Sequence, residues 1–254
     1  MGRYTHTALR HEWVLCPMPG PLEIGNHVAM TNWDREVERL AEHGRDREAA
    51  ALAVRHLSVA ARQGESVDPI EQLNQLAPVL GGVVTQIGPD QLDNPTPCTG
   101  FTVRGVLGHM ITGATAFAAA FRGEPAPPAD GNGSGDPVGQ FGQAMTGLMD
   151  AVCSPGALDR TITAPFGDVP GQAFARFVVL DGLVHGWDLA TATGQPYRPP
   201  ATLVAEVDAF AREAIVPAMR EAEMFAAPVE APAGATPIEQ LVAFTGRRVE
   251  RNPQ

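Results

Sequence analysis

The stretch QAFARFVVLDGLVHGWDLATAT, residues 172–193, decides the fold class of this chain. Apolar side chains fill most of its positions, and a glycine follows at position 194, as glycine commonly follows the end of a helix. The stretch therefore predicts one long, strongly apolar helix. We expect this helix to belong to the core of the protein.

Other helices are expected on both sides of this one. Asp68 can cap a helix, and apolar residues at three- and four-residue intervals continue that helix to Ile87. A further helix begins at Thr99 or Thr102 and runs to Phe121. Additional segments are expected as helices over residues 137–152, 201–220 and 237–247, and as a short extended stretch or hairpin over residues 161–169.

Long helices joined by short connections predict an all-α fold. We expect an antiparallel four-helix bundle whose core helices begin near residues 70, 103, 138 and 172, with extra helices at both ends. Residues 1–65 are expected to form an N-terminal extension, partly irregular, with two short polar helices over residues 34–43 and 45–62. Residues 66–254 are expected to form the helical-bundle domain.

Composition excludes several classes of protein. The 254 residues carry a formal net charge of -11, and all 18 cationic residues are arginine. The phosphates of nucleic acids repel such an acidic chain, and no apolar run is long enough to span a membrane. The first 30 residues lack the apolar segment of a signal peptide, and three cysteines do not make the disulfide framework of a small secreted domain. We expect a cytoplasmic monomer or homodimer that acts on a small molecule, without nucleic-acid or membrane partners.

Asp181 and His185 lie four residues apart in the apolar helix, so their side chains project from one face. The spacing alone is not decisive, because Glu23 and His27 repeat it in a stretch without helical periodicity. What distinguishes Asp181 is its apolar surroundings, where a carboxylate without a partner is costly. The chain has no lysine, and Arg176, the nearest arginine, lies off that face. A metal ion is therefore a sensible partner for this carboxylate.

His109 lies in the helix expected to end at residue 121, where Gly105, Thr112 and Gly113 leave room beside its imidazole. A lone histidine on an inward face is more often hydrogen-bonded core than a ligand, and this alternative stays open. If His109 meets the pair on the other helix, two imidazoles and one carboxylate converge, with coordination positions left open.

Three other residues have weaker claims to a role in a site. Asp188 can accept a hydrogen bond from the free ring nitrogen of His185, or it can lie on the helix surface. Arg104, in a first helical turn, can bind an anionic cofactor or substrate, with a plain surface position as the alternative. Cys98 can form a thiolate near a helix N-terminus, although a structural role in a turn is favoured. No residue is assigned a catalytic role.

Three segments carry a resemblance to a known family. NPTPCTGFTVRGVLGHM at 94–110, GALDRTITAPFGDVPG at 156–171 and LDGLVHGWDLATATGQP at 180–196 resemble the actinobacterial DinB/YfiT-like metal-binding proteins. These are similar to the N-terminal domain of mycothiol-dependent maleylpyruvate isomerase. The resemblance covers about residues 68–250 and implies a four-helix bundle that holds a divalent metal, with zinc favoured and nickel or iron as alternatives.

Matched motif to motif, the resemblance implies that His109, Asp181 and His185 are the metal ligands. Many relatives have glutamate where this chain has Asp181. Aspartate is one methylene shorter, so the metal must lie closer to that helix or be reached through water.

Three functions remain open at this point. The first is a metal-dependent enzyme acting on a small electrophile, an isomerase or a thiol transferase with mycothiol as cosubstrate, as the resemblance implies. The second is a non-catalytic metal- or ligand-binding bundle with a regulatory or sequestering role. The third is a structural bundle without metal, which requires protein donors to satisfy Asp181.

Overall fold

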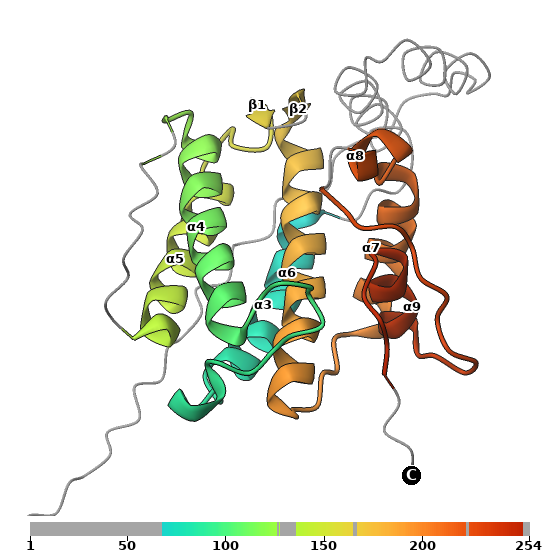
Figure 1. Ribbon diagram of the computed structural model, residues 1–254. Coiled ribbons are helices and arrows are strands. Elements are labelled where there is room, and N and C mark those ends of the chain that lie inside the picture. The colour runs from blue at the N-terminus through green and yellow to red at the C-terminus, as the bar shows by residue number, and fades with distance from the viewer. Residues whose placement is uncertain (1–67, 126, 128–135, 165–166, 222–223, 251–254) are drawn as a thin grey trace, which may run out of the picture.

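The computed structural model describes residues 68–125, 127, 136–164, 167–221 and 224–250 (Figure 1). These residues are mostly helical with one small two-stranded sheet, which confirms the expectation of a predominantly α fold. The N-terminal extension of residues 1–65, with its two expected polar helices, lies outside the described residues. None of the helices in the described part of the chain is long and apolar enough to cross a lipid bilayer.

Four long helices make up the first two thirds of the described chain: α3 (Pro69–Val84), α4 (Val103–Arg122), α5 (Pro137–Val152) and α6 (Gly171–Thr193). Their ends follow the expected signals. The Asp68 carboxylate accepts a hydrogen bond from the backbone N–H of Ile70 at 2.9 Å, and the Thr102 hydroxyl accepts one from Gly105 at 3.2 Å. Gly194 ends α6 with a φ of 68°, in the left-handed region that favours glycine.

Helix α6 lies in the middle of the molecule, between α3 and α4 on one side and the C-terminal helices on the other (Figure 1). This central place explains its apolar sequence, because most of its residues are buried. Two glycines let neighbours come close. A Cβ atom at Gly182 would lie 2.9 Å from Leu76 of α3, and one at Gly186 would lie 2.5 Å from the Tyr197 hydroxyl. The close contact of α3 with α6 therefore depends on Gly182, and the contact of Tyr197 with α6 depends on Gly186.

The short extended segment is a hairpin. Strand β1 (Thr161–Ala164) pairs antiparallel with β2 (Gly167–Pro170), and Ile162 opposite Val169 faces the core. Helix α6 begins directly after β2, so the hairpin fixes where the central helix starts.

The C-terminal region holds α7 (Ala201–Ala214), α8 (Pro217–Glu221) and α9 (Pro237–Phe244). The expectation of one helix over residues 201–220 is wrong. Ile215 leaves the helical region with a ψ of 83°, and Pro217 disfavours helical backbone at the residue before it. The expected helix over 237–247 also ends early, at Phe244, and this early end places Arg247 in the site described below.

Candidate metal site

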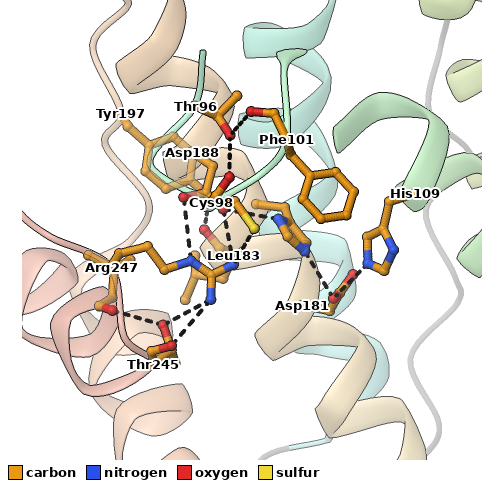
Figure 2. Close-up of polar contacts among 12 residues, drawn as sticks. Thr96, Cys98, Phe101, His109, Asp181, Leu183, Asp188, Tyr197, Thr245 and Arg247 are labelled. Atoms are coloured by element: carbon orange, nitrogen blue, oxygen red, sulfur yellow. Dashed lines mark hydrogen bonds and ion pairs between the residues drawn. The ribbon is translucent and has the colours of Figure 1, made fainter. Parts of the chain in front are cut away.

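Three side chains from two helices meet at one point of the molecule. His109 comes from α4, and Asp181 and His185 come from α6. The Nε2 atom of His109 lies 3.6 Å from Oδ1 of Asp181, and Nε2 of His185 lies 3.4 Å from the same oxygen (Figure 2). The two imidazole rings lie edge to face with their centroids 4.9 Å apart. The structure thus brings together the three residues that the sequence indicates as ligands.

The spacing of these groups fits a divalent metal ion. Ligand atoms about 2.0–2.1 Å from a tetrahedral zinc ion lie about 3.3 Å from one another. The separations of 3.4 Å and 3.6 Å are close to this value, and the three ligand atoms all lie within 4.8 Å of one another. Both separations exceed the roughly 2.7–2.9 Å of a charge-assisted hydrogen bond. The arrangement therefore fits ligands around an ion better than direct pairing of Asp181 with the imidazoles.

The site is closed on one side and open on the other. The side chain of His185 is 10% exposed, whereas those of Asp181 and His109 are 36% and 46% exposed. All three residues line one cavity. An ion held here would keep positions open for a ligand from the cavity side.

His109 and Asp181 shift each other's pKa. The polar contact with the Asp181 carboxylate raises the pKa of His109, against the lowering effect of burial. Burial raises the pKa of the Asp181 carboxyl, but His185, His109 and Arg247 together lower it by more, so the pKa lies below its ordinary value. Asp181 is therefore an anion at neutral pH, as a metal ligand must be.

Asp188 lies behind His185. Its side chain is fully buried, and its Oδ2 atom lies 3.0 Å from Nδ1 of His185. An ionised carboxylate can only accept hydrogen bonds, so Nδ1 of His185 is the donor in this contact and Nε2 is the ring nitrogen left to bind a metal. This is the partner that the sequence suggested for the second ring nitrogen. The contact with Asp188 holds the ring so that Nε2 of His185 faces Asp181.

Sequence reasoning missed Arg247, which a turn after α9 carries back into the site. The N–H of Gly246 donates to the carbonyl of Ala243 at 3.0 Å, and the N–H of Arg247 donates to the carbonyl of Val242 at 2.9 Å. These are the two hydrogen bonds of a Schellman motif, and Gly246 has the left-handed φ of 97° that the motif needs. Gly246 was the signal in the sequence that could have shown where the helix ends.

The Arg247 guanidinium connects the C-terminal segment to the site (Figure 2). Its Nη2 atom donates to Oδ2 of Asp188 at 3.1 Å, and its Nε atom donates to Oδ1 at 3.5 Å. The same Nη2 atom lies 3.6 Å from Sγ of Cys98, and Nη1 donates to the carbonyl of Thr245 at 3.4 Å. The charge of the buried Asp188 is thereby compensated by a cation from a distant part of the sequence.

A second group of possible ligands, Cys98, His185 and Asp188, lies on the other side of the His185 ring. The Arg247 guanidinium already contacts the carboxylate and the thiol of this group. Burial also raises the pKa of the Cys98 thiol, and a protonated thiol is a poor metal ligand. A second cation is therefore disfavoured there, and the group formed by His109, Asp181 and His185 is the better metal site.

The anion-binding role of Arg104 stays a prediction. Arg104 lies 3.5 Å from the carboxylate of Asp93, both side chains are exposed, and it is not among the described residues that line the cavity. The glycines beside His109 do not leave empty space. A Cβ atom at Gly105 would lie 3.2 Å from the Phe101 ring, because that aromatic ring occupies the space.

The cavity beside the three residues has a volume of about 590 Å³. It lies between α4, α6, the loop that precedes α4 and two segments of the C-terminal region, residues 224–226 and 245–247. Its volume is in the range of small-molecule sites in proteins, roughly 300–1,000 Å³. The fold and the site together define a helical protein with a candidate three-residue metal centre at a ligand-sized cavity.

Comparison with known proteins identifies the family. Residues 73–190 match the family described as the mycothiol maleylpyruvate isomerase N-terminal domain, and the chain belongs to this family. Two uncharacterized proteins of Mycobacterium tuberculosis, one from each of two strains, are 31% identical to this chain over 184 residues. Each alignment covers 72% of this chain and 100% of the relative. No solved structure matches.

Proposed function

We propose that this protein is a metal-dependent enzyme that uses mycothiol to act on a small electrophilic molecule, as an isomerase or a thiol transferase. One observation carries the proposal: His109, Asp181 and His185 converge at metal-ligand spacing on the wall of a cavity. The family supports the thiol, because its description names a mycothiol isomerase.

Zinc is the proposed metal, with nickel or iron as alternatives, because two imidazole nitrogens and one carboxylate oxygen suit these ions. The shorter side chain of Asp181 is proposed to bind the metal directly. Its Oδ1 atom lies 3.6 Å from Nε2 of His109 and 3.4 Å from Nε2 of His185, close to the separation of two ligand atoms on one ion. Helices α3 to α6 are proposed to form a DinB-like four-helix bundle, supported by the packing of α3 on α6 and of α4 on α5.

The chain contributes position and charge to the proposed reaction. When bound, a zinc-class ion lowers the pKa of a coordinated thiol and polarises a carbonyl. His109, Asp181 and His185 hold the ion as ligands. Asp188 keeps the His185 ring in one orientation and tautomer, and Arg247 compensates the charge of Asp188. The cavity walls hold the electrophile beside the thiol and limit the access of water.

One observation favours a second candidate, a non-catalytic module that binds a metal or another ligand. Apart from the three ligands, the titratable residues among the described cavity walls are Cys98 and Arg247, and these contact each other. No separate acid or base among these residues stands ready to move a proton. In the enzyme that we propose, the metal and the thiol must therefore do the chemistry.

An assay of product formation in the presence of mycothiol separates the two candidates. Zinc-loaded protein is incubated with mycothiol and a panel of electrophiles, among them enones, epoxides and maleylpyruvate, and thiol adducts and isomers are separated by chromatography and measured by mass spectrometry. We expect turnover that EDTA abolishes and zinc restores. Asp181→Asn should lose it, and Asp150→Asn, the same change at an exposed position of α5, should keep it. Saturable ligand binding without turnover of any electrophile would favour the binding module instead.

A further inference from the structure

The cavity beside the metal site has one polar end and a largely apolar remainder. The polar end holds the three ligands together with Cys98 and Arg247. Most of the other wall side chains are apolar. Aromatic rings are the largest group, and Met224 adds a further large apolar side chain: the rings are those of Phe101, Phe117, Phe174, Phe177 and Phe225.

The two parts are arranged along the helices that form the walls. On α6, Phe174, Val178, Asp181 and His185 follow at intervals of four, three and four residues, so they share one helix face. At 1.5 Å per residue, Phe174 lies about 10 Å along the helix axis from Asp181, with Val178 between them on the same face. On α4, Phe117 lies two turns beyond His109 and about 12 Å along the axis. A molecule with its head at the metal would therefore lie with its body among the aromatic rings.

These apolar walls are fixed in place and partly exposed. The rings of Phe117 and Phe174 meet edge to face at 5.1 Å, and Phe177 packs in the same way on Phe210 at 5.0 Å. In the part of the chain that the structure describes, the two large apolar side chains that are exposed are Phe101 and Met224, and both line this cavity. Exposed apolar surface gathered at one cavity marks a place where an apolar partner binds.

The charges of the cavity do not suit a polyanion. Arg247 is the one permanent cation among the described residues of the wall, and Asp188 already pairs with it. Asp181 adds a negative charge. A substrate with two carboxylates, such as maleylpyruvate, would find a cation for one of them at the metal. For the other, the described wall offers only Arg247, which already pairs with Asp188.

We propose that the substrate of this site is a molecule with an extended apolar, aryl or alkyl body and a single polar head group, rather than a small dicarboxylate. The proposal rests on the proposed function for the head group, which would be held at the metal. The body would be bound by the aromatic walls alone.

Calorimetric titration with a chain-length series tests the proposal. Zinc-loaded protein is titrated with phenylacetate, 4-phenylbutyrate and 6-phenylhexanoate, and with maleate as the small dicarboxylate. We expect the affinity to rise about two- to fourfold for each added methylene, as for methylenes that leave water for an apolar site. Maleate should bind more weakly than 6-phenylhexanoate. Equal affinity along the series, or tighter binding of maleate, would overturn the proposal.

The same titration after EDTA treatment separates this proposal from the metal function. If the chain binds no metal but affinity still rises with chain length, the proposed function fails and the apolar cavity stands. If the chain binds metal but its affinity for the ligands does not change with chain length, the proposal of an apolar substrate is wrong and the proposed metal function is unaffected.

A matched pair of variants locates the apolar wall. Phe117→Gln should lower the affinity for 6-phenylhexanoate at least tenfold and phenylacetate much less, while Phe117→Leu should keep the dependence on chain length. Val178→Thr, which keeps the shape of the side chain, provides a second test if Phe117→Gln does not fold. Unchanged chain-length dependence in folded Phe117→Gln and Val178→Thr would contradict the placement of the apolar body.

Discussion

The Oδ2 atom of Asp188 lies 3.1 Å from the Nη2 atom of Arg247, a residue 59 positions later in the chain. The same oxygen lies 3.0 Å from Nδ1 of His185. The carboxylate therefore joins a candidate metal ligand on α6 to the C-terminal segment, which lies beyond the family match at residues 73–190. This contact extends the candidate site outside the matched region.

Loss of Arg247 should weaken both the fold and the metal site. Arg247→Ala leaves a buried carboxylate without its cation, and we expect a loss of about 3 kcal/mol in the free energy of unfolding. Urea denaturation measures this loss. Arg248→Ala, the same change at the exposed neighbouring position, should cost little. Equal stability of the two variants would show that the ion pair contributes nothing measurable.

The orientation of His185 should depend on Asp188. Asp188→Asn replaces a pure acceptor with an amide and leaves Arg247 without its anion. We expect zinc affinity to fall roughly 10- to 100-fold, the usual effect of losing such a partner. Competition with a chromophoric chelator measures the affinity, with Asp150→Asn as the matched control. Wild-type affinity in Asp188→Asn would contradict the orienting role.

Gly246 should be needed to bring Arg247 into the site. Gly246→Ala places a side chain on a residue with a φ of 97°, and its Cβ would lie 2.5 Å from that of Ala226. Gly156→Ala, at a φ of 76° with open space around it, is the control for backbone strain alone. We expect Gly156→Ala to cost about 1 kcal/mol and Gly246→Ala clearly more, together with weaker zinc binding. Equal losses of stability in Gly246→Ala and Gly156→Ala would contradict the close packing at Gly246.

The stability of the metal-free protein should depend on pH through His109 and Asp181. The raised pKa of His109 adds stability that is present below about pH 6.5 and is lost as pH rises through the folded pKa. The lowered pKa of Asp181 adds stability that is present above about pH 4 and is lost as pH falls through the folded pKa.

Urea denaturation of EDTA-treated protein checks this pH dependence. The stability difference between wild type and His109→Gln should be larger at pH 5.5 than at pH 8. Zinc affinity should change in the opposite direction and rise with pH, because the metal competes with the proton on His109. A stability difference that grows towards pH 8 would contradict the assigned contact between His109 and Asp181.

Local signals predicted most of the helices. Asp68 and Gly194 mark helix ends by their own backbone chemistry, and the four-residue spacing of Asp181 and His185 sets one helix face. These features act within one or two turns, so the sequence carries them without knowledge of the tertiary structure. The break at Ile215 is local as well, because Pro217 disfavours helical backbone at Val216 and has no N–H to continue the helix.

The rest of the site depends on packing between distant segments. The contact of Arg247 with Asp188 joins residues that no short-range pattern connects, and it needs the Schellman motif at Gly246. The aromatic walls of the cavity come from α4, α6 and the C-terminal region.

The central claim is that His109, Asp181 and His185 hold one divalent ion. Elemental analysis of untagged protein, purified without chelators, tests this claim most directly. We expect about one ion per chain in the wild type and in Asp150→Asn, and almost none in His185→Ala and Asp181→Asn. A wild-type protein without metal, or full metal content in both ligand variants, would contradict the claim.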